Sequence, residues 1–140
     1  MIKPKFTLNL NDISFLNTDL EYKIHCYGLN ILPYGVIDKD SHNITANFEN
    51  IQFNQMISNI REFLNKKNQE EFIEIFWSDS NKHSVKCKIG IALKFLDDIA
   101  AEDWDFWIFG DNWIIEYYHE GILSYFENCS INCPVHRGHQ

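Results

Sequence analysis

The chain has 140 residues, a formal net charge of −8 at pH 7 and a sequence pI near 5.1. This is the length of one ordinary domain, and 45% hydrophobic and 15% aromatic residues are enough to build a buried core without metal or disulfide support. The acidic balance argues against general nucleic-acid binding, which needs a basic face, and no segment approaches the ~20 apolar residues that cross a bilayer.

The first residues of the chain are polar and lack the apolar run of about 7–15 residues that a secretion signal contains. We therefore expect a cytoplasmic protein. In that reducing compartment the four cysteines are expected to be free thiols or metal ligands, with Cys26 and Cys87 buried as small hydrophobes. We expect one domain over 1–140, with a core of 1–128 and a loose or metal-bound tail at 129–140.

The first part of the chain predicts antiparallel strands, because apolar and polar residues alternate there with the period of two of a half-buried strand. The alternation covers residues 6–10 and 20–26. A short strand is expected at 44–48, after the polar turn at 38–43. We expect these segments to belong to one curved antiparallel sheet.

One helix is predicted at residues 51–66, where apolar residues recur at spacings of four, three and four. These residues are Phe53, Ile57, Ile60 and Leu64. Strands return at 72–77 and 85–91, and the polar loop between them indicates a hairpin, although the sequence leaves its pairing open. Residues 95–103 are expected to form a short helical turn.

The last part of the chain predicts a three-stranded meander, with strands at 104–109, 113–119 and 122–127. Glycine, aspartate and asparagine occur in the turns at 110–112 and 120–121, as is typical of tight connections that need positive φ. The meander is expected to complete the sheet.

The resulting fold class is α+β: a single domain in which a mainly antiparallel sheet of seven to eight strands packs on one amphipathic helix. The other face of the sheet, or one end of it, is expected to carry the acidic and aromatic surface, in contact with water. On the middle strand of the meander, we assign Glu116 and Tyr118 to this wet face.

Charge is distributed unevenly along the chain. Residues 1–94 contain eleven basic and eleven acidic residues, whereas 95–140 contain nine acids and one base, Arg137. The acidic stretch also holds three of the four tryptophans. Acids that steer encounter and aromatic residues that anchor it are typical of a docking surface for a cationic partner, and the alternative is a solvated face that only keeps the protein soluble. The residues expected at the docking surface are Asp97, Asp98, Glu102, Asp103, Asp105, Trp107, Asp111, Trp113, Glu116, Tyr118 and Glu120.

The C-terminal tail contains four residues that can bind zinc in a tetrahedral site. They are Cys129, Cys133, His136 and His139, with the spacing C-x3-C-x2-H-x2-H. This spacing is tighter than that of common zinc fingers, and the end of a chain is disordered by default. We expect no metal or cofactor, and a zinc site on these residues is the alternative.

Catalytic patterns are weak throughout the chain. Asp103 and Asp105 are two residues apart on a predicted strand and can converge, but such pairs arise by chance in an acid-dense segment. His25 and Cys26 are adjacent and should point to opposite faces of a strand. No phosphate-binding glycine loop or nucleophile elbow is present in the sequence. We expect a protein that is not an enzyme.

In its size, acidity and interleaving of acids with Trp and Tyr over 103–120, the chain resembles the immunity proteins of bacterial polymorphic-toxin and contact-dependent inhibition systems. The resemblance implies a protein that neutralises a cognate toxin domain, such as a basic nuclease, by covering it. It implies a basic protein partner, no nucleic acid and no membrane. A carbohydrate-binding module and a small zinc-stabilised adaptor are the alternatives.

Overall fold

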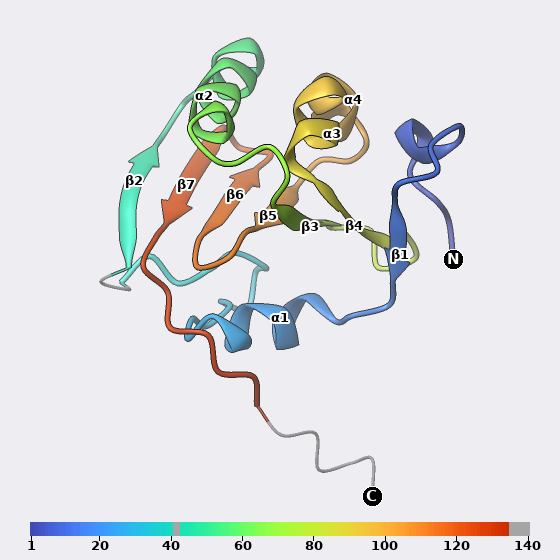
Figure 1. Cartoon of the computed structure of the whole chain (residues 1–140). Coiled ribbons are helices and arrows are strands. Elements are labelled where there is room, and N and C mark those ends of the chain that lie inside the picture. Colours follow the sequence, from blue (N-terminus) through green and yellow to red (C-terminus); the bar gives the residue numbers. More distant parts are fainter. Residues whose placement is uncertain (41–42, 135–140) are drawn as a thin grey trace, which may run out of the picture.

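The computed structural model describes residues 1–40 and 43–134. These residues form one seven-stranded antiparallel sheet with the strand order β1-β4-β3-β5-β6-β7-β2, together with four α-helices (Figure 1). The strands are β1 (Ser14–Leu16), β2 (Ile44–Phe48), β3 (Phe72–Trp77), β4 (Ser84–Lys88), β5 (Phe106–Phe109), β6 (Ile114–Tyr118) and β7 (Ile122–Phe126). The helices are α1 (Leu20–Cys26), α2 (Phe53–Asn65), α3 (Ile89–Lys94) and α4 (Leu96–Ala101), and a 3-10 turn, η1 (Lys5–Thr7), precedes them. The predicted α+β class and mainly antiparallel sheet are confirmed.

The predicted meander is present as β5, β6 and β7, which pair in that order. The predicted hairpin also forms, because β3 pairs with β4 and places Ile75 opposite Val85. On its other side β3 pairs with β5. The five central strands of the sheet therefore come from the contiguous stretch 72–126, and the two edge strands, β1 and β2, come from earlier in the chain.

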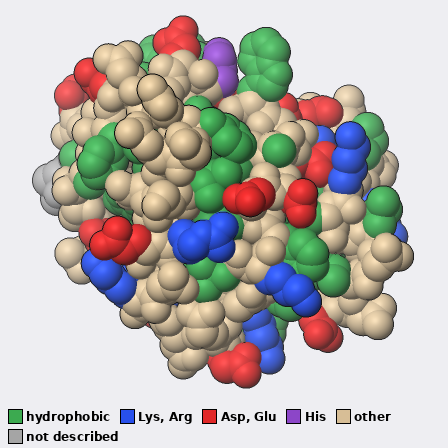
Figure 2. Space-filling view, turned by 90° about the horizontal axis from the view of Figure 1, so that it is seen from above, with side chains coloured by type: hydrophobic (Ala, Val, Ile, Leu, Met, Phe, Trp, Pro, Cys, Tyr) green, Lys and Arg blue, Asp and Glu red, His purple; other side chains and the backbone are tan. Residues whose placement is uncertain are grey.

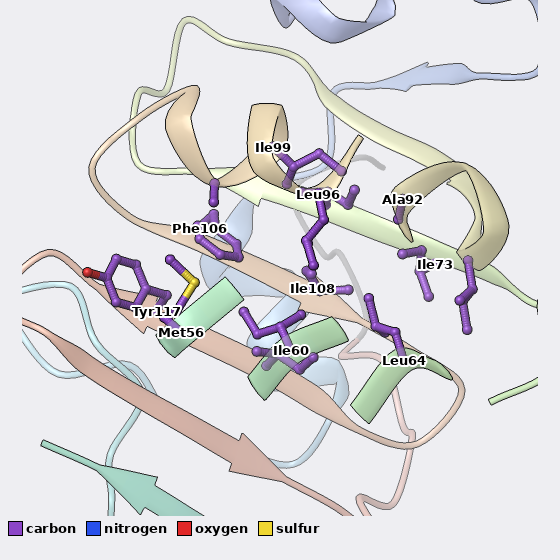
Figure 3. Close-up of a cluster of buried hydrophobic side chains, with 14 of the residues drawn as sticks. Met56, Ile60, Leu64, Ile73, Ala92, Leu96, Ile99, Phe106, Ile108 and Tyr117 are labelled. Atoms are coloured by element: carbon purple, nitrogen blue, oxygen red, sulfur yellow. The ribbon is translucent and has the colours of Figure 1, made fainter. Parts of the chain in front are cut away.

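Helices α2, α3 and α4 cover one face of the sheet (Figure 1). On α2 the side chains of Met56, Ile60 and Leu64 are fully buried, which confirms Ile60 and Leu64 of the predicted apolar face, whereas Phe53 of that face is 48% exposed. Figure 3 shows them between the helices and the sheet, near Ile108 of β5 and Leu96 of α4. Burying each such side chain contributes about 1.5–3 kcal/mol, so this layer is a main source of stability. No helix among the described residues is long and apolar enough to cross a membrane.

Helix α1 and the segment that follows it lie across the opposite face of the sheet, between edge strand β1 and edge strand β2 (Figure 1). Their buried residues Ile24 and Ile37 form one apolar cluster with Trp107 and Phe109 of β5. All four residues of β5 are buried, because alternate side chains point into the two layers. The sheet is therefore covered on both faces, and the prediction of one helix on one face is wrong.

The strand predicted at 20–26 is wrong, because these residues form α1. Asp19 begins the helix by accepting the N–H of Tyr22 at 3.1 Å. Leu20 and Ile24, one turn apart, both pack into the second apolar cluster. The alternating residues that indicated a strand include this i, i+4 pair, so the same apolar pattern fits a strand or a short helix.

Two further boundaries differ from the sequence prediction. The strand expected at 6–10 is absent, and the chain forms η1 at residues 5–7. The strand expected at 85–91 ends at Lys88, because the chain turns there into α3. The short helical turn expected at 95–103 is present as α4.

The C-terminal segment 129–133 is attached to α1. Cys133 forms a disulfide with Cys26, the last residue of α1, and the N–H of Asn132 donates to the carbonyl of Cys26 at 2.7 Å. The N–H of Cys129 donates to the carbonyl of Asn112 in the β5–β6 turn at 2.9 Å. The expectation of free thiols is therefore wrong for Cys26 and Cys133, while the other two cysteines are free and buried. The sequence offered no sign of this pairing because the two residues are 107 positions apart.

Candidate partner-binding surface

The residues expected at the docking surface fall into three groups in the structure. Four are exposed: Asp97, Asp98, Asp111 and Glu120. Four are partly buried: Glu102, Asp103, Asp105 and Tyr118. Three are buried: Trp107, Trp113 and Glu116. The predicted set therefore does not form one continuous face.

Glu116 is the clearest departure from the sequence interpretation, because its side chain is only 1% exposed. One carboxylate oxygen accepts the backbone N–H of Ile37 at 2.8 Å and the indole N–H of Trp107 at 2.7 Å. The other oxygen pairs with the ammonium group of Lys39. The assignment of Glu116 to a wet face is wrong, since the segment after α1 covers this face and supplies two of the partners.

Trp107 and Trp113 belong to the core and offer no ring to a partner. Trp113 lies directly against Gly110, where an added Cβ would come within 1.9 Å of the indole carbon Cε2. Its ring also meets the ring of Phe63 edge-on, with centroids 5.1 Å apart. Glycine at 110 is therefore required for space, and its φ is not positive as the turn prediction assumed.

Glu102 links three parts of the fold. Its carboxylate pairs with the ammonium group of Lys82 at 2.6 Å and accepts the backbone N–H of Lys5 at 2.7 Å. The two paired side chains are 10% and 5% exposed. Glu102 thus holds the end of α4 to the β3–β4 loop and to η1, and it is not available to a partner.

Trp104, which the sequence interpretation did not select, is the most exposed large hydrophobic residue of the described chain, at 72%. It lies in the loop between α4 and β5, because β5 begins only at Phe106. The strand expected over 104–109 implied that Trp104 would alternate with its neighbours, and this pattern does not apply in a loop. An aromatic residue between two acids, Asp103 and Asp105, was the signal available in the sequence.

Trp104 borders a shallow groove of about 480 Å³, called the Trp104 groove here. The lining residues are Phe53, Ala100, Ala101, Asp103, Trp104, Tyr117 and His119. Phe53, at the start of α2, is 48% exposed, so two aromatic rings at this groove face solvent. Burial and then the negative charge of Asp105 raise the pKa of Tyr117, so its hydroxyl stays protonated at neutral pH.

Asp105 and His119 fix the edge of the groove. One oxygen of Asp105 accepts the backbone N–H of His119 at 2.7 Å and lies 2.9 Å from its ring atom Nδ1. The His119 ring lies between two aromatic rings, with centroid distances of 5.2 Å to Trp104 and 4.4 Å to Tyr118. This arrangement orients Trp104 from the end of β6.

The acidic residues of 95–140 do not form a purely acidic surface in the folded protein, because basic residues from other parts of the chain lie among them. Figure 2 shows acidic and basic side chains interspersed over the helical face. Arg61 of α2 lies 3.5 Å from the carboxylate of Asp97; the Arg61 side chain is partly exposed and the Asp97 side chain largely exposed. Asp111 lies in the β5–β6 turn, at the opposite end of β6 from Glu120. Around the Trp104 groove the charged lining is Asp103 with the Asp105–His119 pair, and no Lys or Arg belongs to the described lining.

The proposed zinc ligands are not gathered in the described part of the chain. Cys133 is bonded to Cys26, and burial raises the pKa of the Cys129 thiol to about 11. His136 and His139 lie outside the described residues. Within residues 1–40 and 43–134, no cluster of three or more His, Cys, Asp or Glu side chains has the arrangement of a metal site.

Neither a scan against protein-family models nor a search of curated proteins finds a match for this chain. The Trp104 groove is the candidate site of the described residues. Its described lining combines exposed aromatic rings with a carboxylate and contains no serine, threonine or cysteine. Exposed aromatic rings beside a carboxylate are typical of a binding surface.

Proposed function

We propose that this protein binds a cationic protein partner through the Trp104 groove and the exposed acids near it, and that it is an immunity protein for a basic toxin domain such as a nuclease. The observation that carries the proposal is Trp104, an indole 72% exposed beside the half-exposed ring of Phe53. Tryptophan is among the residues most enriched at interface hot spots, where it anchors the partner.

The acids near the groove have the role of steering. Asp98 on α4 and Glu120 at the end of β6 are exposed and have no ion pair among the described residues. Charges of this kind raise the association rate with a cationic partner and lose this effect as salt screens them. The core carboxylate Glu116 and the Lys82-paired Glu102 are excluded from this role by their contacts.

A cytoplasmic location remains part of this proposal. The Cys26–Cys133 disulfide is a feature more typical of oxidising compartments than of the cytosol. Measuring the thiol state of the protein in cells that express it tests this part separately from partner binding.

The test is co-expression with the product of the adjacent upstream gene, followed by co-purification across a salt series. We expect a one-to-one complex that weakens as salt rises. Trp104→Ala should weaken it by at least about 30-fold, the size of a ~2 kcal/mol hot spot. Phe72→Ala, which removes another ring that is 54% exposed, is the matched control.

Charge reversal tests the steering acids. Asp98→Lys with Glu120→Lys should slow association, whereas Asp111→Lys, at the far end of β6, should leave the rate unchanged. A complex that forms equally well with Trp104→Ala and with the double charge reversal would contradict the proposed surface. Failure to form a complex at any salt would contradict the immunity function.

A carbohydrate-binding module is the second candidate, because an exposed indole beside a carboxylate also suits a sugar ring. Saturable quenching of Trp fluorescence by an oligosaccharide, abolished in Trp104→Ala, would support it. Absence of quenching would remove it.

A further inference from the structure

We propose that the Trp104 groove receives an arginine side chain of the partner, stacked on the Trp104 ring and paired with Asp103. This inference rests on the proposed function and specifies the chemistry of the partner.

Trp104 differs from other aromatic rings of the protein in its surroundings. Several of them lie under a lysine of the same chain: Lys86 is 5.4 Å from the ring centre of Phe72, and Lys67 is 4.8 Å from that of Phe63. Within residues 1–40 and 43–134, no lysine or arginine lies over Trp104 in this way. Trp104 is therefore left without a lysine or arginine, whereas another tryptophan, Trp113, has Lys67 at 5.4 Å from its ring centre, and cations over tryptophan are favourable by about 0.5–2 kcal/mol.

The carboxylate of Asp103 is held in a fixed position at the groove by two hydrogen bonds. Its Oδ2 accepts the backbone N–H of Asp79 at 2.8 Å, and its Oδ1 accepts the backbone N–H of Trp104 at 2.7 Å. These two bonds hold the carboxylate in place beside the indole. Each carboxylate oxygen accepts about two hydrogen bonds, so both retain capacity for a further donor.

The shape and the charge of the groove also favour a cationic side chain. Ala100 and Ala101 of α4 are small and leave space beside the indole. The ammonium group of Lys82 is held by the carboxylate and the carbonyl oxygen of Glu102 and does not pair with Asp103. Lysine and arginine are thus absent from the described lining of a groove that has an aromatic wall and a carboxylate, and His119, which also lines it, is paired with Asp105 and not with Asp103.

Arginine fits these features better than lysine does. Its guanidinium is planar, stacks on an aromatic face and donates two parallel hydrogen bonds to one carboxylate. Lysine presents a point charge that is more strongly hydrated and cannot stack. A neutral side chain of the same shape would keep the stacking and lose the charge pairing with Asp103.

The experiment titrates the full-length protein with the blocked peptide acetyl-Gly-Arg-Gly-amide and follows the ¹⁵N indole resonances by NMR. Its matched control is the same peptide with citrulline, a neutral isostere of arginine. We expect saturable shifts of the Trp104 indole with the arginine peptide and binding of the citrulline peptide at least about tenfold weaker. Asp103→Asn, which keeps an acceptor for the N–H of Asp79 but loses the one for the N–H of Trp104, should weaken arginine binding at least about threefold, and Phe72→Ala should leave it unchanged.

Equal binding of the two peptides would overturn the proposal, as would shifts that persist in Trp104→Ala. Shifts with an oligosaccharide and none with the arginine peptide would also overturn it. Thermal unfolding of each variant shows whether it is folded; Trp104 is exposed, so its replacement is expected to fold.

The test separates this inference from the proposed function. Arginine binding without a complex with the upstream gene product would support the groove assignment and refute the immunity function. A toxin complex that is insensitive to Trp104→Ala, together with no peptide binding, would leave the immunity function standing and refute the arginine site.

Discussion

The carboxylate of Glu116 and the backbone N–H of Ile37 are joined by a hydrogen bond of 2.8 Å between residues 79 positions apart in the chain. Glu116 lies on β6, and Ile37 lies in the segment that covers this face of the sheet. The same oxygen also accepts the indole N–H of Trp107. One buried carboxylate therefore holds the covering segment to the sheet.

Replacing Glu116 with alanine is predicted to destabilise the fold by about 3 kcal/mol. The change leaves the N–H groups of Ile37 and Trp107 without their acceptor and removes the partner of Lys39. Urea unfolding measures the loss. Glu120→Ala, in an exposed residue at the end of β6, is the control and should change stability by less than about 0.5 kcal/mol. Equal effects of the two variants would contradict the role assigned to Glu116.

Replacing Gly110 with alanine is predicted to cost about 1–3 kcal/mol, because the new methyl group would overlap the indole of Trp113. Gly90, in α3, is the matched control. Its nearest neighbour to an added Cβ is the carbonyl oxygen of Gln69 at 3.5 Å, an ordinary contact. Gly90→Ala should stabilise the protein by about 0.5 kcal/mol, since alanine is the better helix former. Thermal unfolding of both variants checks the opposite signs.

Reducing the Cys26–Cys133 disulfide is predicted to lower the free energy of unfolding by about 2–4 kcal/mol, because the bond closes a long loop in the unfolded chain. Cys133→Ser should show the same loss and should then be insensitive to reductant. Thermal unfolding with and without dithiothreitol measures both. Mass spectrometry that finds four alkylated cysteines without prior reduction would contradict the pairing.

The free thiols of Cys87 and Cys129 are predicted to be unreactive in the folded protein at pH 8. Burial raises their pKa from 9.0 to about 12 for Cys87 and to about 11 for Cys129, with Glu127 adding to the rise at Cys129. Iodoacetamide should modify both in urea and neither in its absence. Rapid labelling of the folded protein would refute this.

The same pKa shifts predict a loss of stability in alkali. Above pH 9 the unfolded thiols release protons while the folded ones keep them, so the unfolded state gains the free energy of ionisation. The free energy of unfolding is therefore unaffected by these two thiols below pH 9, and it declines as the pH rises toward their folded-state pKa values of about 11 and 12. Urea midpoints measured from pH 7.5 to 10.5 should therefore fall above pH 9.

The parts of the fold that could be predicted depend on local patterns. The meander and α2 follow from a period of two with turn residues and from helical spacing, because neighbours in sequence are neighbours in these elements. The layer formed by α1 and the segment after it depends on contacts between segments that are distant in the sequence. Its one local sign was the run Phe106-Trp107-Ile108-Phe109, since a strand that is apolar on both sides is typical of a sheet covered on both faces.

The candidate surface was predictable only in part. The acidic residues at this surface can be selected from the sequence, but the spacing does not show which acids already have partners, as Glu102 has with Lys82. Trp104 was hidden by the strand boundary, which differs from the expected one by two residues. Whether a tryptophan anchors a partner or a core depends on such boundaries, as the burial of Trp107 and Trp113 shows.

The placement of β1 and β2 at the two edges of the sheet has a consequence for folding. Three of the four pairings among the strands from 72–126 are hairpins, namely β3–β4, β5–β6 and β6–β7, and the fourth, β3–β5, spans α3 and α4. Most of these contacts are local in sequence, which favours fast assembly of the five strands. Before β1 pairs with β4 and β2 pairs with β7, the strands β4 and β7 present unpaired edges that can pair with other chains. The first fifty residues thus supply the strands that close both edges of the sheet. A protein shortened at this end should aggregate rather than simply lose stability.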